Sequence, residues 1–423
     1  MKINLQELVD KGVISEATAL KIKNYYQTTP DRDSNRILLV FGVLGAVLLG
    51  LGIILILAHN WDNFSRSIKI FWAFFPLLSA QALGFYILWQ KSQSKIWCET
   101  GAVLLFFAIA TVISLIGQIY HIAGDTPKFL LTWLLLALSL VYIFRSYFVS
   151  LLYLVLLTAF VVSANHWNYS EPIRPWLYWG LLVVWLPYYV KLIKKYAATN
   201  FTAFHHWFVV ASLLIAFGSY PSGGADWHLL AYVLLLGILL LTGYLSFFKQ
   251  LPWYKNAYFL TGIIGLSGLL LFFSFDVFWL HNESLIWTES LSQIFFYIFI
   301  VLFVSWLALF LYLLHQKAIE VLDLTLYIAP SIIVIYFLSH WLHEANYLAN
   351  LLILIWGVYF IVTGNKKNSL INMNFGMLLV SMLILFRFFD TDLSFILKGI
   401  IFIVLGLAFF GVNYLLVKKR KYE

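Results

Sequence analysis

Fourteen apolar stretches of membrane-spanning length follow one another along the chain, and they constrain its fold more than any other feature. Most of the surface must face lipid, because 62% of the residues are hydrophobic and only 11% are charged. The sequence therefore predicts an all-α, polytopic membrane bundle of about fourteen transmembrane helices. The predicted spans are 37–58, 68–90, 98–119, 128–143, 147–164, 176–193, 203–220, 227–248, 256–275, 291–315, 320–340, 345–363, 370–387 and 393–417.

Basic residues favour alternate connections between the spans, which sets the predicted topology. With the N-terminus inside, 21 of the 27 basic residues fall on the inner side, and ten of the 19 acidic residues fall on the outer side. Because basic connections stay in the cytoplasm, both termini are predicted to be cytoplasmic. We expect the inner face to lie against anionic lipid, and we predict no nucleic-acid partner. The basic residues on the predicted outer side are Arg66, Lys69, Lys128, Arg174, Arg387 and Lys398.

The chain divides into three predicted parts. Residues 1–36 form a cytoplasmic helical hairpin and linker, residues 37–417 form the bundle, and residues 418–423 form a basic cytoplasmic tail. In the hairpin, Gly12 is predicted to end the first helix and Ser15 to cap the second. A stabilising cytoplasmic cap is favoured over a partner-binding module, and no cleaved signal peptide is expected.

Small residues and prolines within the spans predict how the helices pack. Glycine or alanine at helical spacing lets a second helix approach closely, and we favour contacts inside the bundle over homodimerisation. Prolines inside spans are expected to kink them. The two small-residue stripes are Gly42–Ala46–Gly50 and Gly262–Gly265–Gly268, and the prolines are Pro76, Pro187 and Pro330.

Histidines gather at the predicted outer ends of the spans, several of them beside tryptophan. The sequences HNWD, NHWN, DWH and HWLHE show this pairing, which is typical of an aromatic belt at the headgroup layer. A polar cavity open to the outside is the alternative. In HWLHE, His340, His343 and Glu344 share one helix face and are weak candidates for metal ligands. No second matched element accompanies them, so we predict no metal or other cofactor.

The last outer turn, RFFDTDLSFILKG at 387–399, concentrates charge. Lys398 lies about 9 Å down the next predicted helix, so it should face the bundle interior and find a carboxylate. A substrate-lined pocket and a structural ion-pair latch explain the pattern equally well. The candidate substrate-binding residues of this region are Asn374, expected to be buried, together with Arg387, Asp390, Asp392 and Lys398.

An earlier outer connection, GQIYHIAGDTPK at 117–128, adds a second polar group. Gln118 is a candidate for substrate binding, and His121 and Asp125 are candidates for a general base. Asp62, just after the first span, is a third catalytic candidate. A hydrogen-bonded turn is the alternative for 117–128, and its glycine spacing does not fit a phosphate-binding loop.

Three of these segments carry a family resemblance. ELVDKGVISEATALKIKNYY, LGAVLLGLGIILILAHNWD and GQIYHIAGD, within about the first 145 residues, resemble the bacterial membrane family called domain of unknown function 2157. The segment that begins NFGMLLVSMLILFRFFDTD resembles the C-terminal region of its longer members. The resemblance implies a multi-pass protein of the bacterial inner membrane, beside other membrane-protein partners, and implies no established activity.

Three classes of function follow from these observations. An outer cavity that binds or moves a polar, anionic or lipid-linked envelope substrate is slightly favoured. An integral-membrane transferase or hydrolase with outer carboxylates is the first alternative, so the sequence leaves open whether the protein is an enzyme. A membrane scaffold for an envelope complex is the second.

Overall fold

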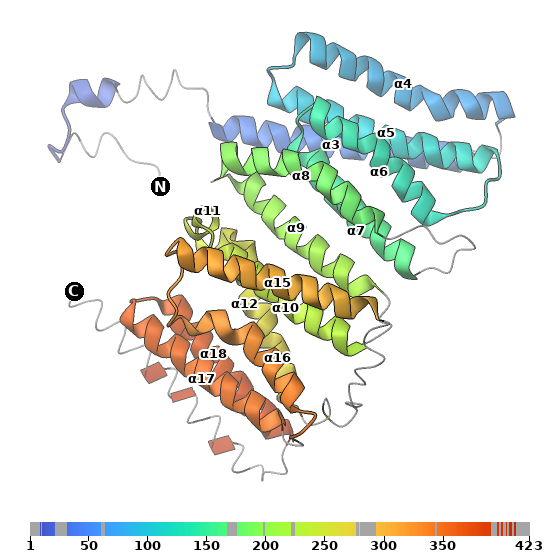
Figure 1. The fold of residues 1–423 in the computed structure, drawn as a ribbon. Helices are drawn as coiled ribbons and strands as arrows, with labels where there is room; N and C mark the ends of the chain where they lie inside the picture. The colour runs from blue at the N-terminus through green and yellow to red at the C-terminus, as the bar shows by residue number, and fades with distance from the viewer. Residues whose placement is uncertain are drawn as a thin grey trace. The chain divides into compact units, whose positions relative to one another are not determined.

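The computed structural model of the protein describes residues 11–21, 32–60, 64–166, 176–197, 199–220, 225–275, 293–342 and 345–390, with Val9, Trp279 and single positions between 396 and 411. Every secondary-structure element within these ranges is a helix, as the apolar pattern predicts. The chain forms two compact units, Met1–Lys191 and Leu192–Glu423. Each unit is an assembly of helices with its own buried side chains (Figure 1).

Unit 1 is built around one central helix, α5 (Lys95–Ile119). This helix packs against α3 (Arg32–Asn60), α4 (Arg66–Gln90), α6 (Thr126–Ile143) and α7 (Tyr147–His166). Within its most apolar stretch 61% of the residues are buried, against 28% for both α4 and α6, so α5 is the core of the unit. Helix α8 (Leu177–Tyr196) crosses the boundary between the units.

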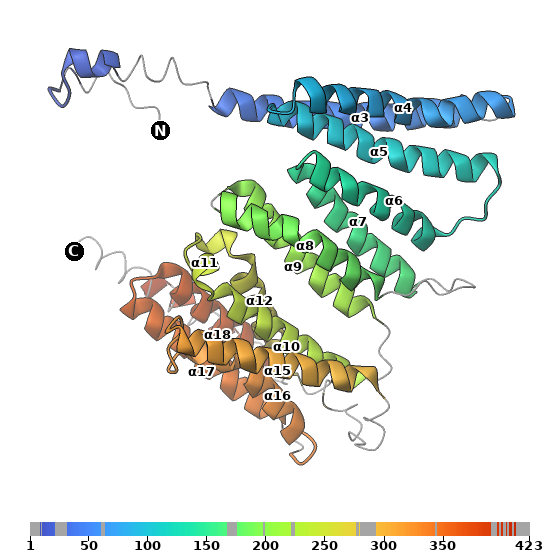
Figure 2. The same ribbon diagram turned by 45° about the horizontal axis from the view of Figure 1, so that its top comes forward.

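The helices of unit 1 alternate in direction, which brings several helix ends together. Both views show that α4 begins at the end of the unit where α3 and α5 end and where α6 begins (Figures 1 and 2). The short connection between α5 and α6, residues 120–125, lies at this end. The first turns of α4 and α6 are thereby brought to the C-terminal end of α5.

The first small-residue stripe packs inside unit 1. A methyl group on Gly42 would lie 3.1 Å from Thr100 Oγ1, and one on Gly50 would lie 3.4 Å from Phe107, both in α5. Ala46, between them, is buried. The predicted internal use of this stripe is confirmed, because glycine at both ends lets α3 approach α5 closely.

Unit 2 is organised around α10, which packs mainly against three helices. Its partners are α12, α15 and α16, while α17 and α18 form a hairpin of their own (Figure 2). The elements of the unit are α9 (Asn200–Ser219), α10 (Ala225–Gly243), α11 (Ser246–Lys249), η2 (Trp253–Lys255), α12 (Ala257–Phe272), α15 (Ile294–His315), η3 (Leu324–Tyr327), α16 (Ile328–Leu338), α17 (Ala345–Lys366) and α18 (Leu370–Asp390).

The second small-residue stripe packs only in part. A methyl group on Gly262 would lie 2.6 Å from the backbone of Leu240 in α10, and one on Gly265 would lie 2.7 Å from the side chain of Leu236. Gly268 has open space at the same position. The close approach of α12 to α10 therefore depends on the first two glycines, and the prediction for Gly268 is wrong.

Helices occupy the first thirteen predicted spans, and the last, 393–417, lies largely outside the described residues. Nine of the described helices are long and apolar enough to cross a membrane. The total of fourteen spans and the cytoplasmic placement of both termini stay predictions.

The predicted span 320–340 is not one helix. It consists of the 3-10 turn η3 followed by the 11-residue α16. Pro330 is the third residue of α16, just after the change from the 3-10 turn to the α-helix, and its kink stays a prediction. Pro76 and Pro187 do lie inside helices, α4 and α8.

Two predictions for the N-terminal hairpin are confirmed locally. Gly12 has a φ of +69° and donates its N–H to Val9 O over 2.9 Å. Ser15 Oγ accepts a 3.2 Å hydrogen bond from the N–H of Thr18. Glycine ends one helical turn and serine caps the next, as their ordinary preferences indicate.

Candidate functional site

An open pocket of about 1640 Å³ lies at the end of unit 1 where α4 and α6 begin and α5 ends. Its lining comes from the first turns of α4, the last turns of α5, the connection 120–125 and the first turns of α6. The structure thus brings Gln118, His121 and Asp125 to one site, as their shared connection suggests. The charged and strongly polar side chains of the lining are Arg66, Lys69, Gln118, His121, Asp125 and Lys128.

The end of α5 positions His121 through a left-handed helix stop. His121 donates its N–H to Gln118 O, and Ile122 donates to Gly117 O, which is the paired pattern of a Schellman motif. The φ of His121 is +52°. Lys317 and Asn368 end α15 and α17 with the same pattern and φ values of +52° and +51°. The conformation of His121 is therefore a recurrent helix end and is not itself a sign of function.

The start of α6 positions Asp125 and Lys128. Asp125 Oδ1 accepts a 2.9 Å hydrogen bond from the N–H of Lys128 and so caps the helix. Its other oxygen, Oδ2, lies 3.1 Å from Lys128 Nζ. Because both carboxylate oxygens are engaged, the geometry gives Asp125 a structural task, and a role as general base stays a prediction.

The start of α4 contributes two cations to the pocket. The guanidinium of Arg66 lies 4.7 Å from the ring centre of Tyr120, a cation–π contact that joins α4 to the end of α5. Lys69 follows one turn later. Ser65 precedes the helix, but its side chain makes no capping hydrogen bond. The backbone N–H groups in the first turn of α4 therefore do not donate to the Ser65 hydroxyl.

Apolar side chains from three helices complete the lining. Phe74 comes from α4, Ile113 and Ile116 come from α5, and Phe129 comes from α6. Phe74 follows Arg66 by eight residues, a rise of about 12 Å along the helix. The pocket therefore combines a cationic group of side chains with an apolar wall that extends well along α4.

A buried carboxylate that the sequence analysis overlooked lies at the other end of α5. Glu99 has no exposed surface, and its Oε1 accepts a 2.8 Å hydrogen bond from Tyr147 N. Its Oε2 accepts from Phe148 N over 3.2 Å and from the hydroxyl of Ser146. These donors lie at the start of α7, so Glu99 caps that helix from α5.

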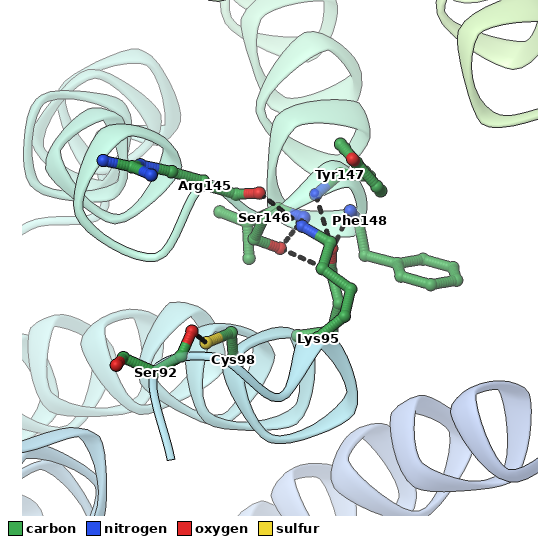
Figure 3. A network of polar contacts seen from close by, with 9 residues as sticks. Ser92, Lys95, Cys98, Arg145, Ser146, Tyr147 and Phe148 are labelled. Carbon is green, nitrogen blue, oxygen red and sulfur yellow. Dashed lines mark hydrogen bonds and ion pairs between the residues drawn. The ribbon is translucent and has the colours of Figure 1, made fainter. Parts of the chain in front are cut away.

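Lys95 completes this network of polar contacts (Figure 3). Its Nζ lies 2.9 Å from Glu99 Oε1, donates to Arg145 O over 2.5 Å and lies 3.6 Å from the ring centre of Tyr147. An intramembrane acid is a functional candidate by default, but here four donors satisfy the carboxylate. The network is a tertiary link between α5 and α7. In the sequence Glu99 stands at the edge of the predicted span 98–119, and only its i,i+4 spacing from Lys95 could have drawn attention to it.

The residues predicted from the last outer turn are described in part. Arg387 donates from Nη2 to Ser274 O and lies 5.9 Å from the ring centre of Phe275, so it joins α18 to the end of α12. The predicted latch is an ion pair that closes the last hairpin, whereas this contact is a hydrogen bond to a backbone carbonyl just after α12, so the choice between a pocket and a latch stays open. Asn374 is exposed on α18, which corrects the expectation of burial, because α18 turns Met373 and Gly376 towards α17. The Asp390 side chain, Asp392 and Lys398 lie outside the described residues.

The candidate metal ligands also fall partly outside the described residues. His343 and Glu344 are not described, and His340 Nδ1 lies 3.2 Å from Tyr336 O. Within the described ranges no group of three or more histidine, cysteine or acidic residues is arranged to hold a metal ion. Asp62 is likewise not described, so its catalytic candidacy stays a prediction.

Comparison with known proteins finds one family that matches the N-terminal part of the chain. Residues 6–150 match the family described as "Predicted membrane protein (DUF2157)". The matched range contains every residue of the pocket lining and the whole Glu99 network. None of the curated proteins and none of the solved structures compared with the chain match it. The resemblance of the C-terminal segment lies outside the matched range and stays a prediction.

The family match and the nine long apolar helices agree with each other. The chain is a membrane protein with several apolar helices.

Proposed function

We propose that this protein, in the bacterial inner membrane, binds an amphiphilic envelope substrate whose anionic head occupies the pocket of unit 1. The observation that carries the proposal is the composition of the pocket lining. Three cations, Arg66, Lys69 and Lys128, share one pocket with apolar side chains from α4, α5 and α6. A lipid-linked anion needs both kinds of surface.

The predicted topology adds support, because it puts this end of unit 1 on the outer side. A positively charged surface is favoured on the inner side, so three cations gathered at an outer pocket are against the general trend. Basic residues that go against this trend call for a local partner. Asp125 is already such a partner for Lys128, and an anionic ligand would add a second one at the same pocket.

The volume of the pocket also fits an amphiphile. Small-molecule pockets commonly measure about 300–1000 Å³, and this one is larger at about 1640 Å³. The extra space suits a ligand with a chain as well as a head. Transport of this ligand across the membrane would require a second access route, and binding is therefore the part of the function that we propose.

Native mass spectrometry of the detergent-purified protein tests the proposal. The wild-type protein should retain an amphiphile with an anionic head. The variant Arg66→Gln/Lys69→Gln should retain about tenfold less, because each lost charge-assisted contact weakens binding. The control is Lys91→Gln, which removes a cation from the opposite end of the same helix.

Two results would overturn the proposal. One is an absence of bound amphiphile in the wild-type protein under conditions that preserve its fold. The other is equal retention by the double variant and the Lys91→Gln control. Thermal unfolding of all three proteins is measured alongside, so that a loss of binding is not confused with a loss of folding.

A further inference from the structure

We infer that the ligand is an acyl lipid, whose ester or amide carbonyl groups accept hydrogen bonds from Ser114 and Gln118 of α5. This inference rests on the proposed function and names the chemical class of its ligand. It depends on the neutral side chains of the pocket and on their depth along α5, and it does not depend on the net charge of the lining.

The face of α5 that lines the pocket carries two neutral polar side chains. Ser114 and Gln118 are four residues apart and both line the pocket, so they lie on the same side of the helix. Both residues are exposed. Within the described part of the chain, neither side chain makes a hydrogen bond. The hydroxyl group of Ser114 and the amide group of Gln118 are therefore both available to a ligand.

Gly117 keeps the space beside these two side chains open. It lies on the same face of α5 and also lines the pocket. A methyl group on Gly117 would have nothing within 4 Å. Thr132, on the α6 side of the pocket, donates its hydroxyl group to Lys128 O, so that hydroxyl is already used inside its own helix. The donors that face open space are those of α5.

The depth of Ser114 determines which part of an amphiphile it meets. Ser114 lies five residues before Ile119, the last residue of α5, which is a rise of about 7.5 Å. Arg66 begins α4 and Asp125 caps α6, so these charged groups lie at the end of the pocket where α5 ends. Phe74 belongs to the apolar wall deeper along α4. Ser114 thus lies between the charged end of the pocket and its apolar wall.

Two classes of anionic lipid differ at this depth. In an acyl lipid, ester or amide carbonyl groups connect the head to the chains, whereas an isoprenoid phosphate has only hydrocarbon below its phosphate. A serine hydroxyl and a glutamine amide can each donate a hydrogen bond to a carbonyl oxygen. A polar group that faces hydrocarbon without a partner is unfavourable. The acyl lipid therefore suits Ser114 and Gln118, and the isoprenoid lipid does not.

The test compares two lipids that differ only in these carbonyl groups. Diphytanoyl phosphatidylglycerol has two ester carbonyls, and diphytanyl phosphatidylglycerol has ether linkages with the same head and the same chains. Each is titrated against the full-length protein in a maltoside detergent, and bound lipid is counted by native mass spectrometry. Thermal unfolding of every variant is measured alongside.

The wild-type protein should bind the ester lipid about fivefold more tightly than the ether lipid, which corresponds to one net hydrogen bond. Ser114→Ala/Gln118→Leu should lower the affinity for the ester lipid to that for the ether lipid and leave the ether lipid unchanged. Gly117→Leu should weaken both lipids by filling the pocket, without loss of helix stability. The control is Ser79→Ala, because Ser79 is an exposed serine of α4 outside the pocket lining.

The other outcomes separate this inference from the proposed function. Equal affinity of the wild-type protein for the two lipids, with both weakened by Arg66→Gln/Lys69→Gln, would overturn the acyl lipid and leave amphiphile binding intact. A preference for the ester lipid that persists in Ser114→Ala/Gln118→Leu would overturn the assignment to these two residues. Saturable binding of neither lipid would also overturn the inference, and the proposed function is then decided by whether the purified protein retains another amphiphile.

Discussion

Tyr336, near the end of α16, donates a hydrogen bond from its fully buried hydroxyl group to the carboxylate of Asp226 at the start of α10. A second tyrosine–carboxylate hydrogen bond joins the end of α10 to the start of the η3–α16 segment. In this second bond the tyrosine follows α10 and the carboxylate precedes η3. Tyr244, just after α10, donates to Asp323 Oδ2 over 2.7 Å, and Asp323 directly precedes η3. The antiparallel pair of α10 and the η3–α16 segment is therefore held by one phenol–carboxylate bond at each end.

Loss of the first of these bonds should destabilise unit 2. Tyr336→Phe removes the hydroxyl group from a buried site and leaves Asp226 without this donor, which costs about 1–3 kcal/mol. We expect a lower midpoint of thermal unfolding, measured by intrinsic fluorescence in detergent. Tyr347→Phe is the control, because Tyr347 is exposed on α17. Equal midpoints for the two variants would show that the bond contributes nothing to stability.

Glu99 should be among the most sensitive positions of unit 1. Glu99→Gln removes the charge that accepts from Tyr147 N and Phe148 N and pairs with Lys95, and hydrogen bonds to a charged group are worth about 2 kcal/mol. Thermal unfolding and the yield of folded protein measure the effect. The matched change Glu16→Gln, at an exposed position, should leave both unchanged. A fully stable Glu99→Gln protein would contradict the capping role.

Alanine at Gly262 and at Gly268 should have different effects, although both lie on α12. A methyl group at Gly262 meets the backbone of Leu240 at 2.6 Å, and such overpacking costs about 1–3 kcal/mol. Gly268 has open space, so Gly268→Ala should be neutral or slightly stabilising through better helix propensity. Unfolding midpoints of the two variants decide the question, and similar destabilisation by both would argue against close α10–α12 contact.

The predicted topology can be tested with single cysteines. Cys98 is the single cysteine of the sequence, so a Cys98→Ser background has no thiol that could react with such reagents. In this background, Ala123→Cys between α5 and α6 should react with an impermeant maleimide in intact cells. Gln250→Cys, on a predicted inner connection, should react only after the membrane is opened. The reverse pattern would invert the predicted orientation.

The positions of most helices could be predicted from the sequence, because apolar runs as long as α4, α5 or α17 have only one stable form in lipid. The region 316–342 was harder. The apolar residues after Glu320 predict one span, yet Asp323 caps a 3-10 turn, and the α-helix begins only at Ile328. A local hydrogen bond thus outweighed the apolar pattern.

Half of the candidate site could be predicted and half could not. Gln118, His121 and Asp125 share one short connection, so their proximity follows from the sequence. The approach of Arg66 to Tyr120 depends on how α4 packs against α5, which no local pattern encodes. The same is true of Glu99, whose partners at 146–148 are set by the packing of α5 against α7.

The left-handed residue that ends α5 offers a way to separate binding from folding. Glycine is the residue that this backbone conformation prefers, so His121→Gly should relieve strain at the helix end while it removes the imidazole from the pocket. Most substitutions in a binding site weaken the scaffold as well. Here the scaffold should gain stability, and any change in ligand affinity can be attributed to the missing side chain. Lys317→Gly and Asn368→Gly, at the two equivalent helix ends of unit 2, would calibrate that gain away from the pocket.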